Sequence, residues 1–238
     1  EPEKTPESAE TTISTKSEEQ PKPKEAFNHD VWNQLLKTHV SDEGHVNYKG
    51  FQKDKAQLKQ YIAQLATNMP NNDWQRNEVL AYWINAYNAL TVDLILKHYP
   101  VSSIKDIKNP WDDRLWKLGD KWYNLGEIEH EILRKMDEPR IHFAIVCASF
   151  SCPKLSNEAF TAKDLDKQLT RNTKGFLSDS KRNIITVNEI QISRIFQWFS
   201  KDFKQNGSIT DFINKYTDID IASNAKTKYL DYNWALNE

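Results

Sequence analysis

The chain has 238 residues, with 32 basic and 34 acidic side chains and a formal net charge of −2. This length suits one large domain or two small ones, and an aromatic content of 11% supplies large side chains for a core. No basic run and no Lys/Arg stripe interleaved with aromatics occurs, so the sequence argues against a nucleic-acid partner. Four polar residues interrupt the longest apolar stretch, residues 79–96, so we expect no membrane span.

The first 25 residues differ in composition from the rest of the chain. They hold seven Glu, four Lys and four Pro, and no aromatic residue. Such a segment buries too little apolar area to offset its ordering entropy. We therefore expect residues 1–26 to be a disordered acidic tether and residues 27–238 to be a single globular domain.

The composition of this tether also bears on location. A tail of this kind is common behind a cleaved signal or a lipid-anchored Cys, and it predicts a periplasmic or extracellular protein. A lipid anchor at the N-terminus is then the only membrane contact that we expect. The alternative is an ordinary disordered terminus.

Three helices are predicted in the first part of the domain. Trp32, Leu35 and Leu36 mark the first, and apolar residues at helical spacing from about residue 53 mark the second. The third, roughly residues 74–98, is apolar on all sides. That pattern is typical of a helix buried at the centre of a fold.

Two hairpins are predicted next, at residues 116–123 and 184–192. In the first, Gly119-Asp120 lies between aromatic-rich arms, which suits a type II′ turn. Between the hairpins we expect a helix near residues 126–135 and a strand at 141–147. The remaining helices are expected near residues 163–177, 193–203 and 209–215. The predicted fold class is α+β, a helix-rich single domain with a small antiparallel sheet.

Cys147 and Cys152 are the only cysteines. Pro is favoured at the first position of a helix, so Cys152-Pro153 predicts that Cys152 caps a helix. The dipole and free N–H groups of that helix would lower the pKa of the thiol. Cys147 closes an apolar strand, so we expect Cys152 to be the reactive thiol. A Cys147–Cys152 disulfide and two inert core thiols are the alternatives.

A nucleophilic thiol needs a base, and His130 is the candidate. On the predicted helix, Glu129 falls inside the apolar arc, and His130 lies just beyond its edge, with Arg134 one turn along. A carboxylate on an apolar face is costly unless it is paired, which singles out Glu129. The alternative is that both residues join a buried polar network with Arg134 or Arg140.

Asn85 and Asn88 interrupt the central helix on one side. One of them could orient an imidazole, as in a Cys/His/Asn arrangement. The favoured interpretation is that they bond a loop backbone and fix the packing. His142 is expected on a strand face rather than in the site. No Gly-rich phosphate loop, His-x-x-x-His pair or Cys-x-x-Cys occurs, so we expect neither a cofactor nor a metal.

Several blocks together resemble a known family, the domain of unknown function 547. They are residues 82–90, 128–134, 140–144, 147–153, 196–203 and 229–237. The resemblance covers roughly residues 45–237 and implies no particular activity. The Asn, His and Cys blocks invite comparison with papain-like thiol enzymes, and the order Asn85, His130, Cys152 would require a permuted version of that fold.

The sequence therefore predicts a thiol-dependent hydrolase or acyltransferase with a cleft at the Cys152 loop. The partner is expected to be a small molecule or peptide that the sequence does not identify, and peptide, amide and thioester bonds are all left open. The alternative is a non-enzymatic extracytoplasmic binding or scaffold module, with Trp111, Trp116 and Trp122 as an exposed ligand platform. The predicted site residues are Cys152, His130, Asn85, Glu129 and Cys147.

Overall fold

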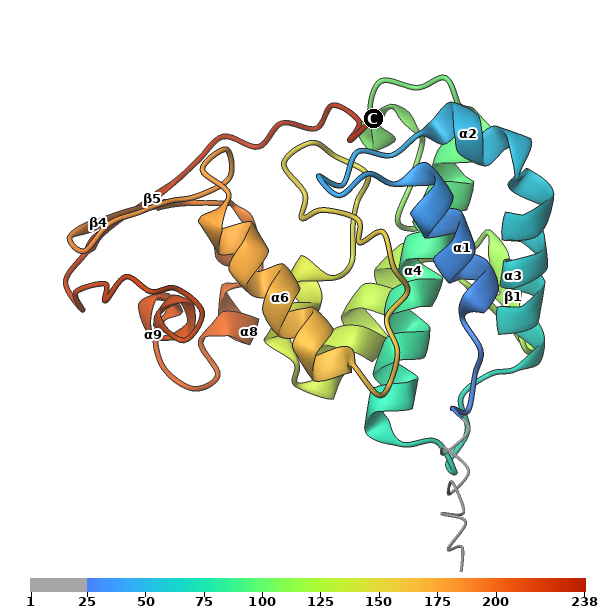
Figure 1. Ribbon diagram of the computed structural model, residues 1–238, viewed down its shortest axis with the longest axis horizontal. Coiled ribbons are helices and arrows are strands. Elements are labelled where there is room, and N and C mark those ends of the chain that lie inside the picture. The colour runs from blue at the N-terminus through green and yellow to red at the C-terminus, as the bar shows by residue number, and fades with distance from the viewer. Residues whose placement is uncertain (1–24) are drawn as a thin grey trace, which may run out of the picture.

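The computed structural model describes residues 25–238. The predicted tether lies, up to residue 24, outside the described residues. Figure 1 shows a body of packed helices around α4 (Arg76–His98) and a smaller region around the sheet that contains β4 (Glu189–Ile192). Three helices pack beside α4 or beside each other: α1 (Asp30–His39), α2 (Tyr48–Lys53) and α3 (Lys55–Thr67).

The central helix is confirmed. Every residue of α4 from Leu80 to Leu96 is buried, because its apolar side chains cover the whole circumference. By length and composition alone α4 qualifies as a membrane span, but 94% of its most apolar stretch is buried inside the protein. Gln75 and Glu78 form a capping box at its start.

Both predicted hairpins are confirmed, and they belong to two small sheets. In the first, β1 (Trp116–Leu118) pairs antiparallel with β2 (Lys121–Tyr123), and Gly119 takes the positive φ, +58°, that a II′ turn needs. In the second, β3 (Ile184–Ile185) pairs antiparallel with β4. However, β4 also pairs in parallel with β5 (Lys226–Tyr229), so this sheet is mixed rather than antiparallel.

The predicted strand at residues 141–147 is wrong. The segment begins in a 3₁₀ helix, η4 (Pro139–Phe143), and continues without regular structure. Pro139 at its first turn and the Glu138 side chain, which accepts from the Arg140 N–H, start that helix. A short apolar run that is buried on all sides does not distinguish a strand from a helix by its period.

The predicted helix near residues 126–135 forms with an irregular backbone. It runs from α5 (Leu125–Glu127) through the π turn η2 (Ile128–Ile132) into the 3₁₀ helix η3 (Leu133–Met136). The remaining elements are η1 (Ile104–Asp106), α6 (Leu165–Ser178), α7 (Ile195–Trp198), α8 (Ser200–Phe203) and α9 (Ile209–Asn214).

Two hydrophobic clusters hold these elements together. The first surrounds α4, and the second joins Phe143 to α6, β4 and the helices α7 to α9. From β5 the chain crosses to its C-terminus near α2 (Figure 1), where the Tyr48 hydroxyl donates to the Asn237 side chain at 2.8 Å. The protein is thus a helix-rich α+β fold with small sheets, and its arrangement does not show a papain-like fold.

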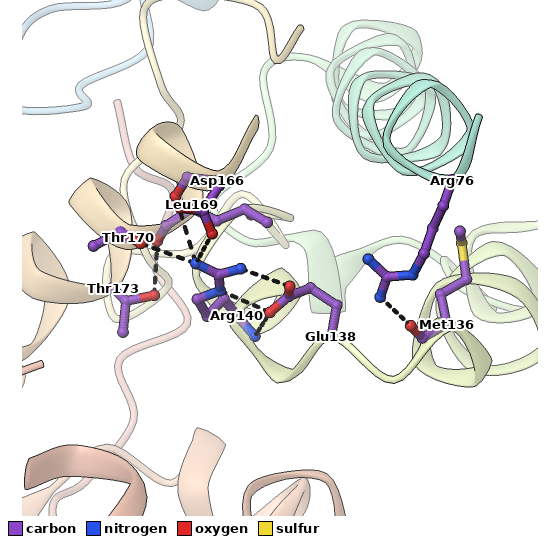
Figure 2. A network of polar contacts seen from close by, with 8 residues as sticks. All are labelled: Arg76, Met136, Glu138, Arg140, Asp166, Leu169, Thr170 and Thr173. Carbon is purple, nitrogen blue, oxygen red and sulfur yellow. Dashed lines mark hydrogen bonds and ion pairs between the residues drawn. The ribbon is translucent and has the colours of Figure 1, made fainter. Parts of the chain in front are cut away.

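Arg140 ties η4 to α6 (Figure 2). It donates to both carboxylate oxygens of Glu138, at 2.8 and 2.7 Å, and to Asp166 and Thr170 of α6, at 2.8 and 2.9 Å. Arg140 and Glu138 are largely buried, whereas Asp166 is exposed. The network holds in place the segment that leads to Cys147.

We expect Arg140→Met to lower the free energy of unfolding by about 1–3 kcal/mol, because it leaves the buried Glu138 carboxylate without its partner. The exposed Asp166 pair adds little. Urea unfolding, monitored by circular dichroism, measures the loss in the free energy of unfolding. Arg171→Met is the matched control. Arg171 lies on α6, but its ion pair with Glu158 is at the surface of the protein. Equal losses in the two variants would contradict this account.

Candidate functional site

A cavity of about 200 Å³ lies between η2, the cysteine loop (residues 147–152), α7 and the C-terminal tail (residues 230–238). Four of the five predicted site residues line it, namely Glu129, His130, Cys147 and Cys152. The fifth, Asn85, is not among its lining residues. His142 and Tyr232 are further polar residues in the wall, and the aromatic lining consists of Tyr87, Trp111, Trp198, Phe199 and Trp234.

The cysteine loop, residues 147–152, is held by the C-terminal tail. Phe150 N–H donates to the Ala235 carbonyl at 2.7 Å, and the Asn237 N–H donates to the Ala148 carbonyl at 3.1 Å. Ala148 has a φ of +58°, a conformation that costs free energy for a residue with a Cβ. The tail contacts offset that cost and fix the turn that directly follows Cys147.

Both thiols are free, and they face each other across this loop. Their sulfurs lie 2.9 Å apart. Cys147 Sγ also contacts Ser149 Oγ at 3.1 Å and Tyr232 Oη at 3.4 Å. Cys152 Sγ accepts from the Cys147 N–H at 2.9 Å. Cys147 Sγ therefore has more hydrogen-bond donors around it than its neighbour.

The structure corrects the basis on which Cys152 was expected to be the reactive thiol. No helix begins at Pro153, so no helix dipole acts on Cys152. Cys152 is only 4% exposed, and burial raises its pKa well above the ordinary value. Cys147 is partly exposed, and the hydrogen bonds from Cys152, Ser149 and Tyr232 outweigh burial and lower its pKa to about 6. The geometry favours Cys147.

Glu129 is a buried carboxylate beside these thiols, at 8% exposure. It accepts a hydrogen bond from the Tyr87 hydroxyl at 3.1 Å. Burial raises its pKa, although the charge of His130 and the Tyr87 hydrogen bond oppose this, while the charge of Cys147 raises it further. The π turn that carries Glu129 is a backbone feature that is frequent at functional sites.

His130 lies at the exposed rim of the cavity. Its Nδ1 is 3.1 Å from Nη1 of Arg134. A guanidinium only donates, so Nδ1 accepts and the ring proton of a neutral His130 is on Nε2. No hydrogen bond within residues 25–238 joins His130 to a thiol. The structure thus places His130 in the Arg134 network, which was the alternative interpretation.

That network continues to residues that the sequence interpretation missed. Arg134 binds both carboxylate oxygens of Asp202, at 2.7 and 2.9 Å, and His142 Nε2 lies 2.8 Å from Asp202 Oδ2. Burial opposes ionisation of Asp202, but the hydrogen bonds from Arg134 and His142 prevail and hold its pKa well below the usual range. Burial lowers the pKa of His142, whose ring stacks on Phe199 at 4.0 Å.

Asn85 and Asn88 bond loop backbone, as in the favoured interpretation, and Asn85 does not take the imidazole-orienting role for which it was counted as a site residue. The Asn85 side chain exchanges two hydrogen bonds with the Phe160 backbone, at 2.8 and 3.0 Å. Asn88 donates to the Ala144 carbonyl at 2.9 Å and accepts from the Val146 N–H at 3.0 Å. Both therefore fix loop backbone, and only Asn88 does so next to Cys147.

The three tryptophans do not form the exposed platform that the alternative interpretation implied. Trp116 is buried and donates to Asp93 at 2.8 Å, and Trp111 is partly buried in the cavity wall. Trp122 alone of the three is largely exposed, at 53%. A larger hollow of about 1060 Å³ lies elsewhere, between α6, β3 and residues 216–219. It contains no thiol.

A comparison with known proteins finds one family that matches part of this chain. The model of the family described as protein of unknown function, DUF547, matches residues 71–177. This range includes Glu129, His130 and both cysteines but ends before Asp202 and Tyr232. No curated protein and no solved structure matches the chain.

Proposed function

We propose that this chain, which contains a DUF547 domain at residues 71–177, is a thiol-dependent acyl hydrolase or acyltransferase with Cys147 as its nucleophile. The observation that carries the proposal is a partly exposed cysteine in the cavity wall, Cys147, whose sulfur lies within 3.4 Å of the Cys152, Ser149 and Tyr232 side chains. Hydrogen bonds to sulfur favour the thiolate, which is the reactive form.

In the proposed reaction the Cys147 thiolate attacks a carbonyl carbon. A carbon–sulfur bond forms, and the carbonyl π electrons move to oxygen. Collapse of this intermediate restores the carbonyl and breaks the bond to the leaving group. The leaving group needs a proton, and a later water, alcohol or amine must lose one.

Glu129 suits both proton transfers. Burial raises its pKa, which favours the neutral form that can protonate the leaving group. The resulting carboxylate then accepts a proton from the attacking acceptor and frees Cys147. Paired groups whose environments push their pKa values in opposite directions are the usual arrangement for acid–base work. His130 lies at the rim, where Nδ1 contacts Arg134 and Nε2 carries the ring proton of the neutral side chain.

The aromatic wall indicates the kind of acyl group. Tyr232 and Trp234 lie 4.6 Å apart between ring centroids, and Trp198 lies 5.8 Å from Trp234. Such surfaces bind apolar or planar groups and exclude water from the reacting carbonyl. We therefore propose an apolar or aromatic acyl group on the substrate.

We expect iodoacetamide to label Cys147 of the native protein, with a rate that rises as pH increases through about 6, the pKa of this thiol. The reason is that only the thiolate reacts, and its fraction grows with pH. Cys152 is expected to react only after denaturation, because it is buried. Mass spectrometry of peptides identifies the labelled residue at each pH.

Labelling of Cys152 in preference to Cys147 would contradict the proposal, as would slow labelling of both after denaturation only. The aromatic cavity also suits a non-enzymatic binding module. That second function would be favoured if Cys147 labels as expected but Cys147→Ala binds an aromatic acyl probe, such as a naphthoyl amide, as tightly as the native protein and neither turns it over.

A further inference from the structure

We propose that Cys147 and Cys152 together form a redox-active dithiol, which reduces a low-molecular-weight disulfide and leaves a Cys147–Cys152 disulfide in the protein. The two free sulfurs lie 2.9 Å apart. Both cysteines line the cavity, and Cys147 is the more exposed of the two. This activity shares Cys147 with the proposed function but does not depend on acyl transfer.

The two thiols differ as an exchange reaction requires. One must be accessible and ionised to attack an incoming disulfide, and the other must be protected until a mixed disulfide has formed. Cys147 is partly exposed in the cavity wall, whereas Cys152 is 4% exposed. Hydrogen bonds lower the pKa of Cys147, and burial raises that of Cys152.

Hydrogen bonds to the backbone around the cysteine loop hold Cys147 and Cys152 in place. Ser151 N–H donates to the Asn233 carbonyl at 3.2 Å, and Arg182 Nε donates to the Cys152 carbonyl at 2.9 Å. The Cys152 N–H closes the loop on the Ser149 carbonyl at 3.1 Å. On the other side of the loop, Asn88 accepts from the Val146 N–H, next to Cys147, at 3.0 Å. Because both ends are held, we expect the sulfurs to meet without a large movement of the chain.

The two cysteines, the substrate disulfide and solvent account for every proton and electron in this reaction. The Cys147 thiolate attacks one sulfur of R–S–S–R′, which forms a mixed disulfide and releases R′–S⁻. The Cys152 thiol passes its proton to that leaving thiolate, giving R′–SH. The Cys152 thiolate then attacks Cys147 Sγ and releases R–S⁻, which takes a proton from solvent. The substrate gains two electrons, and the dithiol loses two; a second dithiol would restore the protein.

The cavity sets the size of the substrate. A space of about 200 Å³ admits one half of a small disulfide, and the sulfur must come within contact of Cys147. The bulky side chains of Trp111, Trp198 and Trp234 line the same cavity. We therefore assign a low-molecular-weight disulfide, and glutathione disulfide serves as its probe.

The test treats the full chain with glutathione disulfide at pH 7, quenches with acid and reads the products by mass spectrometry. We expect the native protein to lose two mass units as it forms the Cys147–Cys152 disulfide, without accumulating a glutathione adduct. Cys152→Ser should accumulate one glutathione on Cys147, because no thiol resolves the mixed disulfide. Cys147→Ser should react at least ten times more slowly than the native protein.

A stable glutathione adduct on the native protein would overturn the proposal, as would formation of the internal disulfide only after denaturation. Circular dichroism melting shows whether each variant is folded, and Cys152→Ala replaces Cys152→Ser if the serine variant is not. Ester turnover without any internal disulfide would refute this inference and leave the proposed function standing. Disulfide formation without ester turnover would do the reverse.

Discussion

Cys147→Ser is expected to lower the turnover of a p-nitrophenyl ester with a short apolar acyl chain by at least about 1000-fold, the size of loss seen when a nucleophile is removed. A serine hydroxyl is not ionised near neutral pH, and among residues 25–238 no imidazole is hydrogen bonded to this position to activate it. Release of p-nitrophenolate, measured under single-turnover conditions, separates the acylation step from product release.

Cys152→Ser is the matched control for that loss. Its hydroxyl keeps a hydrogen-bond donor beside Cys147 Sγ, which now contacts the Cys152 sulfur at 2.9 Å. We expect this variant to lose less than about tenfold in turnover, since it removes no attacking group. Equal losses in both variants would mean that acyl transfer does not pass through Cys147.

Asn88→Ala is expected to lower the free energy of unfolding by about 2–5 kcal/mol and to slow the alkylation of Cys147. The substitution leaves the Ala144 carbonyl and the Val146 N–H without partners in the buried interior, and each unsatisfied group costs about 1–3 kcal/mol. Val146 directly precedes Cys147, so a shift of this segment moves the sulfur. Urea unfolding and iodoacetamide kinetics measure the two effects.

Asn85→Ala separates stability from reactivity. It removes the same number of buried hydrogen bonds from the same helix, but both go to Phe160 rather than to the residues before Cys147. We expect a similar loss of stability and an alkylation rate near that of the native protein, measured well below the unfolding transition. If both variants slow alkylation equally, Asn88 has no special part in placing Cys147.

Features with a local cause could be predicted from the sequence. The central helix follows from an apolar surface on all sides of residues 76–98, and the first hairpin follows from Gly119 between two aromatic arms. The unusual burial of Glu129 was also predicted, because a carboxylate inside an apolar arc needs a partner. That partner is Tyr87, on α4, and nothing in the local sequence pointed to it.

Features with a distant cause could not be predicted. The reactivity of the two thiols was assigned from Pro153 and an expected strand, both local patterns. In the structure it depends on Tyr232, which is 85 residues away from Cys147. Likewise Asp202 lies 68 residues from Arg134. The closing block that contains Tyr232 was noticed as part of a resemblance, yet no role could be assigned to it.

The sequence by itself thus determined the helix-rich α+β class, the central helix, the hairpins and the segments that carry Glu129, His130 and the cysteines. These depend on periodicity, turn chemistry and composition within one element. Only the tertiary structure decided which thiol is exposed, which groups donate to it and that Asn85 lies outside the cavity. Burial and hydrogen bonding are set by whichever residues the fold brings alongside, and the C-terminal tail that clamps the loop at residues 147–152 is more than 80 residues away in sequence.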